Sequence, residues 1–456
     1  MKTVPLLGHA SLDDIFAYRP AGPVRVRDFL AEVEALAALL PVGRHLLNVC
    51  QDRYRFTVGF AAGLLSGKTS LQPSSQSLET LRQIKSARPD VVCLCDSDFD
   101  SLDLPRLDFP AFVAPQGHFL RGAVDAGKVM EIPQIPADRE AAILFTSGST
   151  GAPVAHGKSW GLLVRNGRAE AARLGLFDAP HSIVGTVPAQ HSYGFESTVL
   201  LALHGGSPFW SGKPFYPQDI VAALNAVPPP RLLVSTPFHL SALISAGLEL
   251  PAIDLLLSAT APLAAPLAVA AEASCSAPLY EIYGSTESGQ LASRRTTADL
   301  AWELLPEVML AQEGEDTYAS GGHVEGRVLL SDVIEILANG RFLLHGRHAD
   351  LINIAGKRTS LAYLNHQMAA IPGVADAAFF LPDHESAEAI TRLCAFVVAP
   401  GTTARDVLAE LRQRLDPIFL PRPLIFLDSL PRNSTGKLPR SALQVLYAAK
   451  VEHGGR

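Results

Sequence analysis

The stretch best suited to chemistry in this sequence is a run of hydroxyl-bearing residues and glycines, Thr146, Ser147, Gly148, Ser149, Thr150 and Gly151. It follows the apolar residues 141–145, which predict a short buried strand. Glycines let backbone N–H groups approach an anion and the hydroxyls add donors, so a strand that ends in such a loop is typical of a phosphate site. An ordinary polar loop has the same composition, so the interpretation needs partners elsewhere in the chain.

Other predicted strands also end in small or polar residues. The apolar runs at 183–188, 232–237, 254–258 and 279–283 predict further strands. Three of them lead into His191 and Tyr193, into Ser258, Ala259 and Thr260, and into Tyr283, Gly284, Thr286 and Glu287. Because ligands bind at the carboxyl ends of strands in parallel α/β sheets, we expect these loops to converge on one cleft.

Two near matches to a nucleotide-binding P-loop are rejected. Gly67-Lys68-Thr69 and Gly157-Lys158-Ser159 both end like that motif. The motif also needs a glycine five positions earlier, and alanine stands at positions 62 and 152.

The helices and strands that would position these loops predict an α/β fold. Helical periodicity at 29–40, 54–65, 78–86 and 160–174 alternates with apolar strands at 45–50 and 90–95. From residue 324 the pattern changes to strands at 324–330 and 332–337, interpreted as a hairpin, with a turn at Asn339-Gly340 and a further strand at 342–345. Short strands and helices follow at 361–368, 374–381, 393–398 and 404–415. We therefore expect an N-terminal domain of residues 1–347 and a small α+β domain of residues 348–456.

Composition excludes several classes of protein. A net charge of −7 in 456 residues argues against a nucleic-acid partner. The apolar stretch at 255–271 contains two prolines, and the N-terminus lacks an apolar leader, so no membrane insertion or secretion is expected. Five scattered cysteines without a metal-binding spacing favour free thiols in the cytoplasm.

Five motifs in order resemble those of the adenylate-forming superfamily, which contains acyl- and aryl-CoA synthetases, peptide-synthetase adenylation domains and luciferases. The matching segments are residues 146–151 with Pro153, residues 188–194, residues 283–287, the set Asp332, Arg347 and Arg358, and residues 431–437. The resemblance covers most of the chain. It implies a large N-terminal domain of parallel-rich sheets with helices and a small, mobile α+β C-terminal domain.

The resemblance also implies a reaction. A carboxylate attacks the α-phosphate of ATP, pyrophosphate leaves, and a thiol then displaces AMP. Because the first step brings two anions together, cations and donors must be fixed around the α-phosphate. Lys437 is implied to bridge the two anions, while the loop at 146–151 holds the other phosphates.

Further roles follow from the same resemblance. Glu287, with Thr286 beside it, is expected to be catalytic by binding the Mg²⁺ that bridges the phosphates, and Asp332 is expected to accept hydrogen bonds from the ribose. The remaining ATP-binding candidates are Ser258, Ala259, Thr260, Tyr283, Gly284, Arg347 and Arg358. Each of these residues also has an ordinary structural interpretation. Glu287 could be a surface glutamate, Asp332 a turn-capping aspartate and Tyr283 a core tyrosine, and the arginines could form surface salt bridges.

The sequence departs from the superfamily at several positions. Val154 stands where a loop lysine is usual, so either Lys158 replaces that lysine or the loop works without it. Ala349 occupies the usual place of the hinge aspartate, with Asp350 beside it. Asn353 replaces a common lysine, as in acetyl-CoA synthetases.

The substrate follows from finer similarities. His191 and Tyr193 match the HxY that lines the acyl pocket of aryl-CoA ligases, and histidine can donate or accept. The short N-terminal part and residues 356–361 are similar to small ligases of bacterial xanthomonadin and aryl-polyene pigment clusters. This implies a hydroxybenzoate substrate, 3-hydroxybenzoate before 4-hydroxybenzoate, and an acyl carrier protein or coenzyme A as acceptor. Two alternatives stay open: the same chemistry on a fatty or short-chain acid, and an inactive nucleotide-binding regulator.

Overall fold

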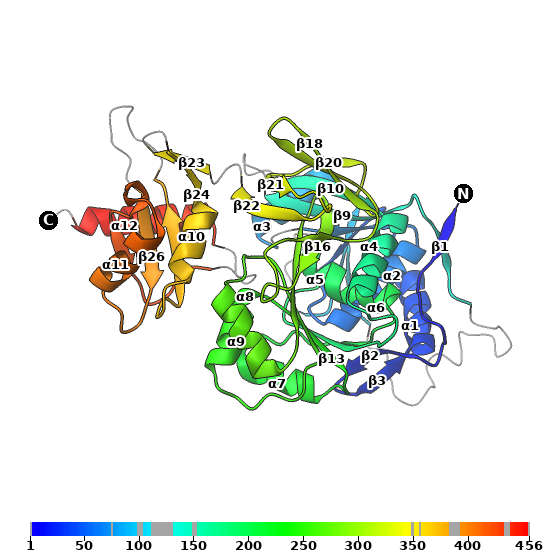
Figure 1. Ribbon diagram of the computed structural model, residues 1–456. Helices are drawn as coiled ribbons and strands as arrows, with labels where there is room; N and C mark the ends of the chain where they lie inside the picture. The colour runs from blue at the N-terminus through cyan, green and yellow to red at the C-terminus, as the bar shows by residue number, and fades with distance from the viewer. Residues whose placement is uncertain are drawn as a thin grey trace.

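The computed structural model of the chain describes residues 2–73, 76–97, 104–110, 131–147, 153–347, 351–354, 357–382, 393–432 and 438–454. Figure 1 shows a large body that contains the elements up to β22 (Phe342–Arg347) and a smaller body at one side. The smaller body contains the elements from β23 (Leu351–Ile354) to α12 (Arg440–Gly454). The expected fold class, an α/β protein with a large N-terminal and a small C-terminal part, is confirmed.

The first large sheet has the strand order β10-β9-β5-β4-β6-β7. Its strands are β4 (His45–Asn48), β5 (Thr69–Gln72), β6 (Val91–Cys95), β7 (Arg106–Asp108), β9 (Glu140–Ser147) and β10 (Pro153–Ser159). Neighbouring strands are parallel except β9 and β10, which form an antiparallel hairpin. Continuous apolar runs such as β6, buried at every position, are typical of strands covered on both faces.

The second large sheet has the order β17-β16-β15-β14-β13-β11-β12-β2-β3. Its strands are β2 (Ile15–Arg19), β3 (Gly22–Arg25), β11 (Ser182–Gly185), β12 (Phe209–Trp210), β13 (Arg231–Ser235), β14 (Leu255–Ser258), β15 (Leu279–Ser285), β16 (Gly289–Arg294) and β17 (Glu303–Leu304). The central strands from β11 to β15 are parallel, whereas β16 and β17 continue the sheet in antiparallel fashion. The strands expected at 183–188, 232–237, 254–258 and 279–283 are therefore confirmed.

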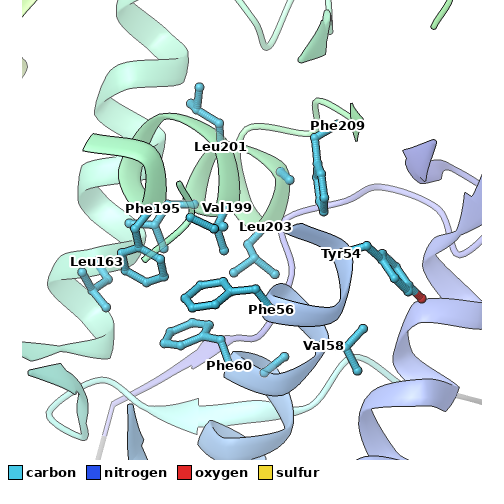
Figure 2. Close-up of a cluster of buried hydrophobic side chains, with 14 of the residues drawn as sticks. Tyr54, Phe56, Val58, Phe60, Leu163, Phe195, Val199, Leu201, Leu203 and Phe209 are labelled. Carbon is cyan, nitrogen blue, oxygen red and sulfur yellow. The ribbon is translucent and has the colours of Figure 1, made fainter. Parts of the chain in front are cut away.

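Helix α2 (Arg53–Leu65) forms the centre of the core. It begins where the carboxylate of Asp52 accepts a hydrogen bond from the backbone N–H of Arg55 at 2.9 Å. Most of its residues on all sides are buried, as expected of a helix enclosed by other elements. Figure 2 shows Phe56 and Phe60 of this helix beside Phe195, with ring centroids 6.4 and 5.0 Å from that of Phe195.

The remaining helices of the large body surround the sheets. They are α1 (Val26–Leu39), α3 (Leu78–Ala87), α4 (Trp160–Arg173), α5 (Ser192–Gly194), a π-helical segment (Phe195–Leu200), α6 (Leu201–His204), α7 (Pro217–Asn225), α8 (Pro237–Ser245) and α9 (Ala265–Cys275). The four helices expected from periodicity are confirmed. Helices α7, α8 and α9 were not predicted, although each has a proline in its first turn, a common helix start.

A group of antiparallel strands follows the second sheet. It comprises β18 (Val308–Glu313), β19 (Asp316–Gly321), β20 (Arg327–Leu329), β21 (Asp332–Ile336) and β22. The turn at Asn339-Gly340 is confirmed: β21 pairs with β22, and Gly340 has a φ of +78°. The hairpin expected between residues 324–330 and 332–337 is wrong, because β20 pairs with β19. The partly exposed strands β18 and β19 lack the apolar pattern that would have revealed this pairing.

The small body has its own core. Its elements are β23, β24 (Lys357–Ser360), α10 (Leu361–Ala369), β25 (Asp376–Phe380), β26 (Cys394–Val398), α11 (Ala404–Arg414), a 3₁₀ turn (Pro417–Phe419), β27 (Leu424–Phe426) and α12. Apolar residues of α10, β26 and α11 pack together. The domain boundary at residues 347 and 348 stays a prediction.

All five cysteines are buried and none forms a disulfide. No helix in the described parts of the chain combines the length and the apolar character that crossing a bilayer requires.

The aromatic core predicts a stability effect. Phe195→Ala removes a fully buried ring next to α2 and should lower the free energy of unfolding by about 3–5 kcal/mol. The control is Val42→Ala, because the Val42 side chain is 99% exposed and its loss should change stability by less than about 0.5 kcal/mol. Urea unfolding followed by tryptophan fluorescence measures both, and equal midpoints would contradict the packing described.

Candidate active site

A cavity of about 230 Å³ lies at the carboxyl ends of β9, β14 and β15, between the two large sheets. Its walls are formed by Gln72, Leu144, Phe145, Thr146, Gln190, His191, Ser192, Tyr193, Glu196, Ala259, Thr260, Ile282, Gly284, Ser285, Thr286, Gly289 and Gln290. Four of the strand-end loops that the sequence singled out therefore border one space. This edge of a parallel sheet is where α/β proteins bind ligands.

The phosphate-loop candidate connects the two strands of the β9–β10 hairpin. Thr146 lies near the end of β9, opposite Val154 on β10, and the Val154 side chain is 48% exposed. The Thr146 hydroxyl is 3.0 Å from Nε2 of His156, two residues farther along β10. The backbone of Ser147 ends β9, whereas Gly148, Ser149, Thr150 and Gly151 lie outside the described residues.

Glu287 occupies a tight turn between β15 and β16. The turn is held by Ser285 and Ser288, whose hydroxyls each accept a hydrogen bond from the other residue's backbone N–H at 3.2 Å. The Glu287 carboxylate is 38% exposed and lies 3.7 Å from Nε2 of His156. Burial raises its pKa, but hydrogen bonds from its own backbone and Ser285, together with the charges of His156 and Lys158, lower the pKa overall.

The donors around Glu287 fit a hard divalent cation. Mg²⁺ is usually bound through one or two carboxylates together with substrate phosphates and water. A partly exposed carboxylate next to Thr286 in the chain, joined to the Thr146 hydroxyl through His156, provides such a set. Within the described residues no group of three or more acidic, histidine or cysteine side chains forms a complete protein cage. The donors present thus fit a cation that phosphates also bind.

Lys158 has a different position from the usual loop lysine. Its side chain is buried, and the ammonium donates a hydrogen bond to the backbone carbonyl of Glu287 at 2.6 Å. Burial lowers the pKa of Lys158, and the nearby carboxylates of Glu196, Glu325 and Glu287 oppose this effect. The ammonium thus fixes the backbone of the Glu287 turn. On β10, His156 rather than Lys158 borders Thr146.

Glycine is required at two positions of this turn. A Cβ on Gly284 would lie 2.2 Å from the carbonyl oxygen of Gly289. Gly289 itself has a φ of +74°, which residues with side chains rarely adopt. The sharp β15–β16 connection that presents Thr286 and Glu287 therefore depends on both glycines.

Some of the predicted adenine and ribose residues border the cavity and others lie outside its lining. Ser258 ends β14 and is buried, while Ala259 and Thr260 border the cavity, Thr260 with a φ of +81°. The Tyr283 hydroxyl donates to Oδ2 of Asp332 at 2.8 Å. The ring of Tyr283 packs against Trp302 and Phe342, with centroids 5.7 and 5.5 Å away. Tyr283 is thus a core aromatic that also orients Asp332.

Three predicted cationic residues cannot be placed as side chains. Arg347 is paired with Asp332 across the β21–β22 hairpin, and Arg358 lies on β24 opposite Asn353. Only the backbone of these two arginines is described. Lys437 lies outside the described residues. Their roles, like the others implied by the family resemblance, stay predictions.

The acid-pocket candidates are placed by the chain before the π-helical segment. His191 is the N-cap of α5, and Tyr193 follows within it. The close turn requires Gly194, because a Cβ there would lie 2.0 Å from the carbonyl oxygen of Pro188. Gln190 donates its amide to the carbonyl of Cys50 at 2.5 Å, which ties this turn to the first sheet.

Several wall residues were missed by sequence reasoning. Gln72 ends β5, Glu196 belongs to the π-helical segment, and Gln290 is the second residue of β16. Glu196 and Gln290 lie three residues after the singled-out Tyr193 and Glu287. Their closeness in the sequence to these residues could have pointed to them. The orientation of the two side chains, however, depends on the irregular π turn and on the β15–β16 connection.

Two buried carboxyl groups lie at or near the cavity: Glu196 lines it, and Glu170 is fully buried. The pKa of Glu170 is raised to about 8, chiefly by burial and also by the charge of nearby Glu196, against the lowering effect of hydrogen bonds with Ser197 and Gln290. The pKa of Glu196 is raised to about 7, because burial outweighs the lowering effects of the Lys158 charge and of hydrogen bonds with Ser192 and Asn166. A carboxyl buried in this way binds its proton more tightly than in water.

Comparison with known proteins agrees with this geometry. The AMP-binding enzyme family matches residues 43–318, and the AMP-binding enzyme C-terminal domain matches residues 365–437. The chain therefore belongs to the AMP-binding enzyme family, and the expected adenylate-forming superfamily is confirmed.

Individual relatives are more distant. The chain is 29% identical to a 4-coumarate–CoA ligase of Rhodobacter capsulatus over 348 residues, which are 75% of this chain and 85% of that one. Its fold is similar to the O-succinylbenzoate coenzyme A synthetase (MenE) of Bacillus subtilis in complex with AMP, with a TM-score of 0.78, 18% identity and coverage of 95% and 96%. The fold is also similar to that of ATP-bound MatB from Rhodopseudomonas palustris, with a TM-score of 0.77, 21% identity and coverage of 96% of each chain.

The buried carboxyls predict a pH dependence of stability. A carboxyl whose pKa of about 8 in the folded protein exceeds its ordinary value of 4.5 stabilises the fold fully below the lower value and loses this effect as pH rises through the higher one. The free energy of unfolding should therefore fall by several kcal/mol between about pH 5 and pH 9. Chemical unfolding at a series of pH values measures this slope.

The matched variants separate Glu170 from other acids. Glu170→Gln keeps the shape but cannot ionise, so the slope should become shallower. Glu315→Gln changes an exposed acid of the β18–β19 turn and should leave the slope unchanged. An identical slope in wild type and Glu170→Gln would refute the assignment.

Proposed function

We propose that this enzyme activates an aromatic carboxylic acid with ATP and then transfers the acyl group to a thiol. The observation that carries the proposal is the cavity, which joins the candidate phosphate residues Thr146 and Thr286 to the candidate acid residues His191 and Tyr193 in one space. Acyl adenylate formation needs that adjacency, because the carboxylate must meet the α-phosphate directly.

In the proposed first step, a carboxylate oxygen attacks the α-phosphorus of ATP and the bond to pyrophosphate breaks. Thr146 donates to a phosphate oxygen, and Asp332, oriented by Tyr283, accepts hydrogen bonds from the ribose. Glu287 would hold Mg²⁺, which when bound would supply positive charge that offsets the charge of the phosphates. Lys437 would neutralise the two anions as they approach.

The cavity supports a compact acid. Its volume of about 230 Å³ is shared between the candidate nucleotide and acid residues, and about 150 Å³ holds one benzene ring, so the acid part has room for about one ring. Aromatic rings are also present in 4-coumarate and o-succinylbenzoate, the acids in the names of two relatives. Hydroxybenzoate, with 3-hydroxybenzoate favoured over 4-hydroxybenzoate, is the substrate that the similarity to pigment-cluster ligases suggests.

The thiol acceptor belongs to the second half-reaction. We propose an acyl carrier protein, in line with the similarity to pigment-cluster ligases, and coenzyme A as the competing acceptor, in line with the names of the relatives. The domain of residues 348–456 would rotate about residues 348–350 between the half-reactions, because Lys437 is needed in the first of them.

Acid-dependent exchange of pyrophosphate into ATP tests the proposal. Hydroxybenzoates should support exchange better than hexanoate or acetate, and Lys437→Ala should reduce exchange about 10²-fold or more. Acceptor competition between coenzyme A and a carrier protein then identifies the thiol. Stronger exchange with hexanoate or acetate, or none with any benzoate, would refute the aromatic assignment, and nucleotide binding without turnover would favour a regulator.

The role of Glu287 predicts a change in metal dependence. Glu287→Gln keeps the size of the side chain but removes the charge that binds the cation. Exchange should fall about 10²-fold or more, and the Mg²⁺ concentration for half-maximal rate should rise. Calorimetric titration with ATP and Mg²⁺ gives a readout independent of turnover. Exposed Glu249 provides the control, since Glu249→Gln should leave both measurements unchanged, and the same Mg²⁺ requirement in Glu287→Gln would exclude this ligand.

A further inference from the structure

One face of strand β10 carries three side chains in a row, those of Val154, His156 and Lys158. They share this face because side chains alternate along a strand, and the pairing of β10 with β9 is regular over these residues. Exposure falls along the face: Val154 is 48% exposed, the His156 side chain 19%, and Lys158 is buried. The face therefore leads from solvent, at the end of β10 next to the phosphate-loop candidate, into the interior.

The middle residue of this face contacts both parts of the candidate nucleotide site. Nε2 of His156 lies 3.0 Å from the Thr146 hydroxyl and 3.7 Å from Oε1 of Glu287. Lys158 is engaged elsewhere, because its buried ammonium donates to the backbone carbonyl of Glu287 at 2.6 Å. Val154, at the usual place of the loop lysine, has no donor in its side chain. The polar group of this face that reaches Thr146 is therefore the imidazole.

The partners of Nε2 determine which ring nitrogen carries the proton. An ionised carboxylate only accepts hydrogen bonds, whereas a hydroxyl can donate or accept. Nε2 faces both kinds of group, so it is the N–H of the imidazole, because a bare lone pair there would point at a negative oxygen of Glu287. The N–H then donates to Oγ1 of Thr146, and the proton of the Thr146 hydroxyl is left for another acceptor.

The direction left to that hydroxyl is the cavity. Among the described residues that line the cavity, Thr146 is present and His156 is not. The imidazole thus lies behind the wall and acts on the cavity through the hydroxyl that it holds. A donor whose orientation is fixed in advance loses less freedom when an anion binds, and this preorganisation increases affinity.

We propose that His156 is a positioning residue for the phosphates of ATP and takes the place of the loop lysine that is absent at Val154. Its N–H fixes Oγ1 of Thr146, so that the O–H of this residue points to a phosphate oxygen. The inference rests on the proposed function, because it takes the cavity as the nucleotide site. The imidazole has an N–H at this position whether it is neutral or charged, so its role requires no change of protonation.

Calorimetric titration with ATP and Mg²⁺, in the absence of any acid substrate, tests the inference. His156→Leu should weaken ATP binding at least about fivefold, as expected for the loss of one hydrogen bond. His156→Gln retains an N–H with a similar reach and should keep most of the affinity. His366→Leu makes the same change at an exposed histidine of α10 and should bind ATP like wild type. Equal losses in the Leu and Gln variants of His156, or no loss in either, would overturn the inference.

A double-mutant cycle separates positioning from a direct contact with ATP. Thr146→Val removes the hydroxyl through which His156 is proposed to act. The double variant Thr146→Val/His156→Leu should therefore bind ATP within about twofold of Thr146→Val alone, because the effects of residues that act through one contact do not add. Losses that multiply in the double variant would refute the positioning role.

Restoring the loop lysine tests the replacement. Val154→Lys should recover most of the lost affinity in the His156→Leu background, whereas in wild type it should change ATP binding by less than about twofold, because His156 already performs the task. A gain of about fivefold or more in wild type would overturn the replacement, even if the His156→Leu variant does not fold. No binding of ATP to wild type would refute the nucleotide site itself, whereas failure of benzoates in pyrophosphate exchange leaves these binding results unchanged.

Discussion

The hydrogen bond from the Lys158 ammonium to the carbonyl of Glu287 joins the two large sheets around the cavity. Lys158 belongs to β10 of the first sheet, and Glu287 belongs to the turn between β15 and β16 of the second. A buried ammonium is stable only when its hydrogen bonds and charge are satisfied. The carbonyl satisfies one requirement and the buried Glu196 the other. Removing Lys158 would leave the Glu287 carbonyl without this donor, so the relative position of the sheets and the metal-binding candidate depend on this contact.

Much of the fold follows from local patterns in the sequence. The strands β6, β13 and β14 contain short continuous apolar runs, and such runs in alternation with amphipathic helices predict a parallel sheet. The antiparallel additions could not be predicted in the same way. β10 has the sequence PVAHGKS, in which three of seven residues are polar or charged, so its identity comes from pairing with β9 rather than from its own pattern.

The candidate site was predictable to a similar extent. Residues at the ends of strands, such as Thr146, His191 and Thr286, could be brought together because parallel strands share one edge. The residues that contact them could not be predicted in this way. His156 reaches Thr146 through the register of an unrecognised hairpin, and Glu196 reaches the cavity through a π-helical turn, which has no simple sequence signature. Resemblance identified the chemistry, but the geometry that adapts the site to Val154 required the structure.

The distribution of charge around the cavity has a consequence for the proposed reaction. The side bordered by Thr146 has a histidine and a carboxylate that stays ionised, whereas the inner wall has carboxyls whose pKa values burial raises to about 8 and about 7. A substrate acid that pointed its carboxylate inward would meet Glu196, which lines the cavity and balances the charge of Lys158. The opposite orientation places the carboxylate beside the candidate phosphate residues Thr146 and Thr286, away from that acid. Electrostatics therefore favours the orientation in which the carboxylate can approach the α-phosphate.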